Sequence, residues 1–243
     1  MQALLDRIET RATATADHPF IRWLDDPAIA TRQRLAGWLP AAAFFVFGFR
    51  DLNAEVLPYP AAEAAACPYR RAINRHLAED ATHWGWYLHD LRLLGADDTL
   101  PFSAALRRLW SDEHAEQRRA VYRLCMLAGQ SSEPALRYAL ISALEAVAHR
   151  LFATVQRVAQ QHEDETGFEL SYLGQRHLER EPGHLTHQAD AEVDLFATLP
   201  LDDLQTARAE SIAEQVIAIV ETRWHEFHRV ALASLPAPQR VAA

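Results

Sequence analysis

The stretch YALISALEAVAHRLFATV (residues 138–155) decides the fold of this chain. Its apolar residues follow one another too closely for a one-sided helix, so the stretch predicts a helix that is buried on most of its sides. Glu145 is the one carboxylate within it. An ionised carboxylate that is buried without a partner costs several kcal/mol. A bound cation would supply that partner, and His149, one turn later, is the alternative.

The sequence on both sides of this stretch also predicts helices, and no segment alternates with period two. Glycine is scarce, with 8 in 243 residues, which favours long helices joined by short loops. Asp26 and Pro27 have the residue types of an N-cap and a first helical position. The expected helices cover about 2–15, 26–52, 68–94, 102–129, 134–163, 168–197 with an interruption at Pro182-Gly183, and 201–235, with a short helix possible in the Pro-bounded connector 58–68.

We therefore expect an all-α, single-domain bundle of about seven helices over residues 1–243. Residues 1–60 would form the N-terminal helices, 68–197 the helices of the candidate site, and 201–235 the C-terminal helix. The apolar run 35–49 is too short to span a bilayer and contains Pro40, so it predicts a buried core helix.

Composition argues against several classes of partner. A net charge of −9 argues against a nucleic-acid-binding protein, because the sequence contains no run of basic residues that would neutralise phosphates. The two cysteines form no CxxC motif, and the N-terminus lacks the basic-then-apolar order of a signal peptide. We expect a cytoplasmic protein with no membrane partner.

A possible metal site begins in RHLAEDATHWGWYLHDL (residues 75–91). Residues four and seven apart share a helix face, so His76, Asp80 and His83 project from one stripe. A neighbouring pair can reach a single ion, whereas all three would serve two ions or one ion and its surroundings. Tyr87 continues the stripe, so it could face the cavity and is the candidate catalytic residue, as a proton donor, although aromatic residues at such positions more often fill the core. Taken alone, such a stripe is more often solvated.

A second copy of the spacing lies about a hundred residues later, in QRHLEREPGHLTHQAD (residues 175–190). His177, Glu181 and His184 repeat the pattern of the first motif with a carboxylate in the middle. Together with Glu145 and the first motif, the chain offers three carboxylates and four histidines. Imidazole and carboxylate ligands from facing helices suit iron or manganese, and zinc less specifically.

Other polar residues have simpler interpretations. The charged segment 112–123, with His114, is expected at the surface, as are His225 and His228, which could also contact a second copy in a homodimer. Asp90 is expected to be structural. His18 is a poor candidate for an axial haem ligand, because its surroundings lack the small residues that a macrocycle needs, and no haem is expected.

The order of a helix ending in His, a lone helix Glu and a final HxxxExxH resembles the heme-oxygenase-like di-iron oxidases and oxygenases. This group of iron-containing redox enzymes shares its fold with the TenA and PqqC families. The resemblance covers about residues 68–197 and includes the 32 residues from Glu145 to His177. It implies a heme-oxygenase-like bundle in which His83, Glu145, His177, Glu181 and His184 are metal ligands.

The chain departs from the family pattern at two places. His76 stands where the family has a Glu, for which Asp80 or Glu79 could substitute. Glu181 replaces an Asp, and Pro182 follows it, so a kink is expected there. The sequence therefore leaves open whether the site binds one ion, two ions or none.

Three functions follow from these motifs. The first is a non-haem iron oxidase or oxygenase, di-iron or mononuclear, that uses O2 on a small metabolite in a helical-bundle cavity; manganese is the other metal considered. The second is a TenA- or PqqC-like metal-independent enzyme or small-molecule binder. The third is a non-catalytic helical protein in which the motifs form a relic polar site.

Overall fold

The computed structural model of the chain describes residues 1–97, 99–175, 177 and 195–236. Within these residues every regular element is a helix, which confirms the all-α prediction. The α-helices are α1 (Gln2–Thr13), α2 (Pro19–Asp25), α3 (Thr31–Ala36), α4 (Ala43–Asp51), α5 (Ala61–Ala66), α6 (Pro68–Asp80), α7 (Trp84–Leu93), α8 (Phe102–Leu109), α9 (Ala115–Gln130), α10 (Pro134–Thr166) and α13 (Asp203–Ser234).

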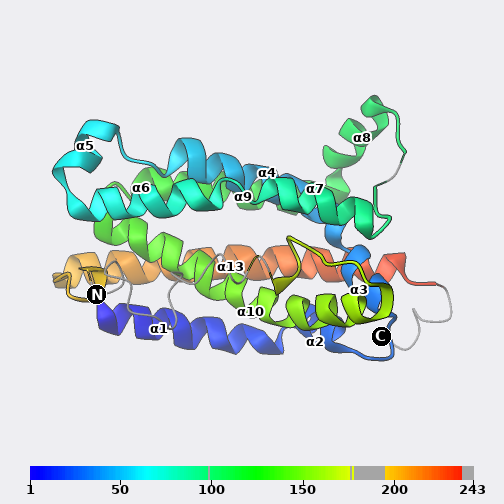
Figure 1. Cartoon of the computed structure of the whole chain (residues 1–243). Coiled ribbons are helices and arrows are strands. Elements are labelled where there is room, and N and C mark those ends of the chain that lie inside the picture. Colours follow the sequence, from blue (N-terminus) through cyan, green and yellow to red (C-terminus); the bar gives the residue numbers. More distant parts are fainter. Residues whose placement is uncertain (98, 176, 178–194, 237–243) are drawn as a thin grey trace.

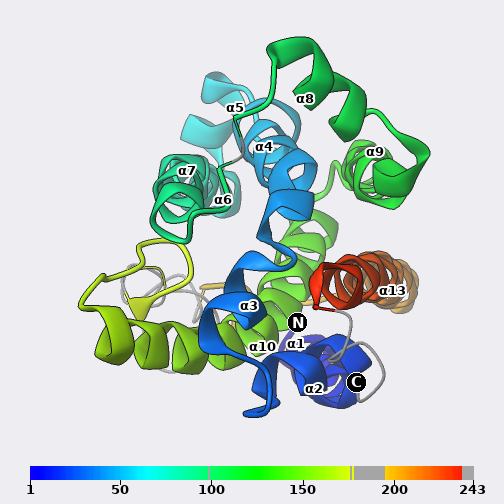
Figure 2. The ribbon, with the colours of Figure 1, turned by 90° about the vertical axis from the view of Figure 1, so that its right-hand side faces the viewer.

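The helices form three levels (Figure 1). α1 and α2 run along one side of the molecule, α4, α6, α7 and α9 cover the other side, and α13 lies between them, while α10 crosses obliquely from the side of α6 toward α2. The end-on view shows the same order, with α6–α7 and α13 on different sides of α4 and α10 (Figure 2). Segments from both ends of the chain therefore enclose α10.

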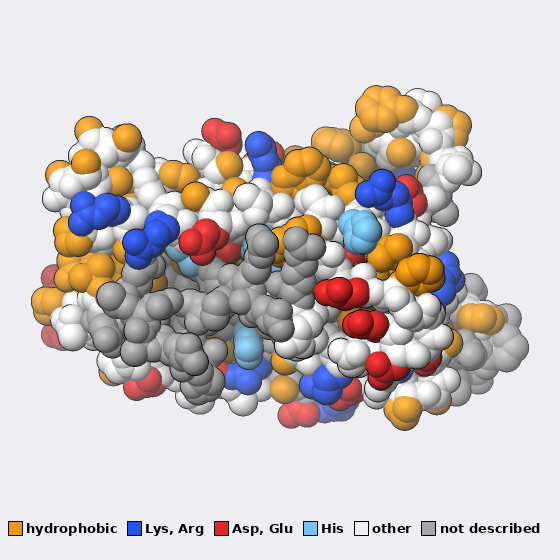
Figure 3. Space-filling view, viewed as in Figure 1, with side chains coloured by type: hydrophobic (Ala, Val, Ile, Leu, Met, Phe, Trp, Pro, Cys, Tyr) orange, Lys and Arg blue, Asp and Glu red, His pale blue; other side chains and the backbone are white. Residues whose placement is uncertain are grey.

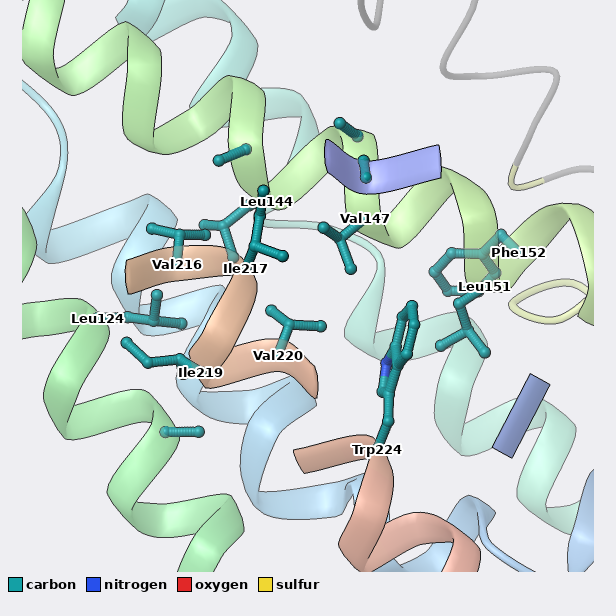
Figure 4. Packing of buried hydrophobic residues seen from close by; sticks show 14 of the residues in the cluster. Leu124, Leu144, Val147, Leu151, Phe152, Val216, Ile217, Ile219, Val220 and Trp224 are labelled. Carbon is teal, nitrogen blue, oxygen red and sulfur yellow. The ribbon is translucent and has the colours of Figure 1, made fainter. Parts of the chain in front are cut away.

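The packing of α10 against α13 is the centre of the core. Val147 of α10 is fully buried, and so are Val216 and Trp224 of α13. Figure 4 shows these side chains between the two helices, with Leu124 of α9 on the same cluster. The buried apolar side chains form one continuous cluster that reaches from Leu4 to Leu235.

Local sequence fixes the ends of these two long helices. α10 begins at Pro134, a residue favoured in the first turn, and ends at Thr166, with Gly167 as its C-cap, whose φ of 75° lies in the left-handed region. α13 begins with a capping box, in which the Asp202 side chain accepts from Gln205 N and the Gln205 side chain accepts from Asp202 N. Both helices were expected from the sequence.

The predicted helix start at Asp26 is wrong. The Asp26 carboxylate accepts a hydrogen bond from Ala28 N at 2.9 Å, so Asp26 and Pro27 stabilise a turn. α3 begins only at Thr31, and the apolar run 35–49 is divided among α3, a 3-10 turn at Leu39–Ala42 and α4.

The predicted helix over 68–94 is interrupted near the site. α6 ends at Asp80, and the next two turns are closed by bonds of the tighter i to i+3 type, from Thr82 N to Glu79 O and from His83 N to Asp80 O. α7 then begins at Trp84. The interruption changes the direction of His83 relative to the stripe of α6.

Two other expected helices are also interrupted. The segment 102–129 is divided into α8 and α9, which a 3-10 turn at Asp112–His114 joins. α8 stands away from the body, and its Phe102 and Trp110 are 79% and 59% exposed; apolar side chains gather over it in Figure 3. The predicted helix over 168–197 is wrong for residues 168–174, which form a loop, and Pro182-Gly183 lies outside the described residues.

Two helical stretches, Thr31–Val56 and Pro134–Thr166, have the length and apolar composition of a membrane span. The second is mostly buried, and the core helix of a protein without a membrane span meets the same criterion. Two such stretches are only weak evidence that the chain crosses a membrane.

Candidate metal centre

The structure brings three of the predicted ligands together. His76 Nε2 lies 3.4 Å from Asp80 Oδ2 and 3.8 Å from Glu145 Oε1. One ligand atom from each of the three residues lies within 4.8 Å of the others. Asp80 follows His76 by one turn of α6, and α6 packs against α10, which carries Glu145. Asp80 and Glu145 are 4% and 9% exposed, so two carboxylates share a site largely closed to water.

A second pair of predicted ligands meets beside this cluster. His177 Nε2 and His83 Nδ1 are 3.2 Å apart, a hydrogen bond in which one imidazole donates and the other accepts. The His83 ring stacks on Trp86 at 4.7 Å, and the His177 ring stacks on Tyr172 at 5.0 Å. The interruption after α6 thus directs His83 toward His177.

Both groups open onto one cavity of about 80 Å³. Asp80, His83, Glu145 and His177 all lie on its wall. The rest of the wall is mostly apolar, and its apolar residues come from α4, α7, α10 and α13 together with the segment before α4: Trp38, Ala42, Phe45, Val46, Phe49, Trp84, Leu144, Ala148, Leu151, Phe152, Val220 and Phe227. A space of this size holds several water molecules or a small ligand.

The loop after α10 is fixed by Asp90 of α7. The Asp90 carboxylate is fully buried and accepts hydrogen bonds from Ser171 N, Tyr172 N and Leu173 N at 2.8 to 2.9 Å. Burial raises the pKa of Asp90, and the three backbone donors oppose that rise. Asp90 therefore positions Tyr172 on the cavity wall, and its predicted structural role is confirmed.

Tyr87 is placed away from the cavity wall. Its side chain is fully buried, and its hydroxyl donates to Leu39 O at 3.0 Å. Burial raises the pKa of Tyr87. The hydroxyl therefore fixes α7 to the segment before α4, and a role as proton donor would require this bond to break.

The other predictions divide into three groups. Glu181 and His184 lie outside the described residues, as do the rest of the second motif beyond His177. The described side chains include no ion pair between His149 and Glu145. The surface prediction for His114 is wrong: His114 is 5% exposed and lies 3.4 Å from the equally buried Glu226.

Arg223 of α13 is a cavity residue that the sequence did not reveal. It is 7% exposed, and its guanidinium carbon lies 3.3 Å from the centre of the Phe45 ring. Burial lowers the pKa of Arg223 to about 9, while Tyr172 and Glu226 act in the opposite direction. The signal for it was present, because Arg223 interrupts the apolar stripe that runs from Val220 to Phe227.

The donor set fits a divalent transition metal. One imidazole and two carboxylates are ligands that iron and manganese accept, and the neighbouring histidine pair could extend the set. Two buried carboxylates close together are unfavourable in ionised form, and a cation between them removes that cost. His76, Asp80 and Glu145 are the residues that would hold the ion.

The fold and the cluster define the class of protein as an all-α bundle with a candidate nitrogen and oxygen metal centre beside an apolar cavity. A scan against models of protein families gives no match, and a search of curated proteins gives none.

Proposed function

We propose that this chain is a non-haem iron enzyme of the heme-oxygenase-like type, an oxidase or oxygenase that acts on a small metabolite. The observation that carries the proposal is the His76–Asp80–Glu145 cluster, which has two members on the wall of an apolar cavity. Bound iron would supply the activation of O2. We also propose that the enzyme acts in the cytoplasm on a dissolved metabolite.

In this proposal the residues of the chain have separate tasks. His76, Asp80 and Glu145 bind the ion, and His83 and His177 either bind a second ion or move a proton between their ring nitrogens. Phe45 and Phe152 exclude water from the cavity wall. Such a dry wall strengthens the electrostatic interactions within the site.

Metal binding is the direct test. The purified protein, stripped with a chelator, is titrated anaerobically with Fe²⁺ and then exposed to O2, while the optical spectrum is recorded. We expect one or two bound ions and a spectral change on oxygenation. Glu145→Gln should weaken binding by roughly tenfold or more, since even groups that only support metal ligands contribute 10- to 100-fold.

Glu163→Gln is the matched control, because Glu163 lies on the same helix and outside the cavity wall. It should bind iron as the wild-type protein does. If wild-type protein binds neither Fe²⁺ nor Mn²⁺, the proposal is wrong. If both variants bind iron like the wild type, the ion does not sit at Glu145.

A second function is favoured by the histidine pair. His83 and His177 are hydrogen-bonded to each other, and both rings lie on the cavity wall. A TenA- or PqqC-like enzyme that uses no metal could employ them as a general acid and base. In that case ligand binding and turnover would survive chelation and would be lost in His177→Ala.

A further inference from the structure

We propose that Arg223 is the recognition site for the carboxylate of a small, otherwise apolar substrate. Arg223 lies on the wall of the same cavity as Asp80, His83, Glu145 and His177. The inference deepens the proposed function, because it names the chemical class of the substrate. It depends on the cavity as a substrate site and does not depend on a bound metal.

The guanidinium is a buried cation to which the described side chains give no anionic partner. Arg223 is 7% exposed, and the described side chains place no carboxylate within 4 Å of its guanidinium. Its Nε atom has no hydrogen-bond acceptor in the described part of the chain. The nearby Glu226 is already paired with His114 at 3.4 Å. A buried charge in this position destabilises the folded protein unless a group of opposite charge binds to it.

The one strong contact of Arg223 leaves its donors available. The guanidinium carbon lies 3.3 Å from the centre of the Phe45 ring and 5.1 Å from that of Phe227. Stacking on an aromatic face stabilises the cation and holds the guanidinium plane in one orientation. The N–H groups of a guanidinium lie in that plane, so stacking does not consume them. A carboxylate accepts two of them in a bidentate geometry.

The cavity sets limits on the rest of the ligand. Apart from Arg223 and the candidate metal ligands, the wall is mostly aromatic and aliphatic, and the space is about 80 Å³. One arginine matches the single charge of a carboxylate better than the nearly double charge of a phosphate monoester. Arg50, the other arginine at the cavity, pairs with Asp51 at 2.6 Å and is exposed. A short hydrocarbon chain with one carboxylate fits these features.

Chelator-treated protein provides the test, because a metal ion would itself bind a carboxylate. Butanoate, hexanoate and hexan-1-ol are titrated into it, and dissociation constants are measured by calorimetry. We expect the better of the two carboxylates to bind roughly tenfold or more tightly than hexan-1-ol.

Three variants distinguish recognition from a structural role. Arg223→Met should lose the preference for carboxylate over alcohol, and Arg223→Lys should keep part of it, because the charge remains and the bidentate geometry does not. Arg229→Met, on the same helix but exposed and paired with Glu113, should behave as the wild type does. Arg223→Met should also melt no lower than the wild type, since it removes a buried charge without a partner.

Other outcomes would overturn the inference. They are equal binding of carboxylate and alcohol by wild-type protein, the absence of carboxylate binding at millimolar concentration, and an unchanged preference in Arg223→Met. A marked fall in the melting temperature of Arg223→Met and Arg223→Lys alike would show a structural role. Metal titration is independent of these measurements, so failure of the iron proposal would leave this result interpretable.

Discussion

Whether a single polar residue of this chain is buried or exposed depends on the helices that surround it. His114 lies in a charged segment of the sequence, yet it is buried beside Glu226 because α9 packs against α13. Arg223 is also buried, on α13, the helix that carries Glu226. Both placements depend on which helix faces which, and periodicity along one segment does not contain that information.

His18 provides a prediction about pH. It is 8% exposed, and its Nδ1 accepts from Phe20 N at the start of α2. Burial lowers the pKa of His18 to about 4, and the neighbouring His225 contributes to the shift. The unfolded chain binds a proton near pH 6.5, so this histidine should destabilise the folded state increasingly as pH falls from about 6.5 to 4, by up to about 3 kcal/mol.

The variant His18→Asn removes that titration and keeps a side-chain cap, because asparagine is a favoured N-cap residue. The free energy of unfolding from urea titrations at pH 7.5, 6 and 4.5 should fall less steeply in this variant than in wild-type protein. Parallel pH profiles for the two proteins would contradict the assignment.

At the scale of elements, the sequence predicted long helices better than their interruptions. α10 and α13 have strong apolar patterns and clear end signals, and both were predicted within a few residues. The interruption between α6 and α7 contains neither Gly nor Pro. It depends on packing around His83, whose partner His177 lies 94 residues away in the chain. Periodicity placed His76, Asp80 and Glu145 on the right faces and could not place His83.

The loop after α10 should depend on Asp90. Asn at this position offers one acceptor oxygen and turns an amide donor toward backbone donors, so Asp90→Asn should lower the free energy of unfolding by about 2–3 kcal/mol. Asp97→Asn is the matched control, because Asp97 is exposed in the loop after the same helix, and its effect should stay within about 0.5 kcal/mol. Urea titrations measure both. Equal effects would mean that the three backbone bonds contribute little.

The end of α10 allows a comparison between two glycines. Gly167 has a φ of 75°, where a Cβ atom costs about 1–2 kcal/mol, so Gly167→Ala should destabilise the protein by that amount. Gly129 lies near the end of α9 with open space around it, and Gly129→Ala should stabilise the protein by about 0.5–1 kcal/mol. Thermal melts compare the signs, and a shared sign would contradict this explanation.

At the scale of the whole molecule, one core connects both ends of the chain. The cluster runs from α1 to the residue after α13, and it includes Trp23, Trp38 and Trp224. Thermal unfolding should therefore give the same midpoint by far-UV circular dichroism and by tryptophan fluorescence. Two separate midpoints would show that part of the chain, such as residues 1–60, unfolds on its own.

The order of the helices has a consequence for biosynthesis. α10 carries a long apolar sequence, and its main cover, α13, is translated after all the other described helices. About 70 residues separate the ends of these two helices, which corresponds to roughly 4–14 s of elongation. A nascent chain exposes the apolar side chains of α10 throughout that interval. Termination before α13 should accordingly yield inclusion bodies or chaperone-bound fragments, whereas a chain that includes α13 covers the same surface with that helix.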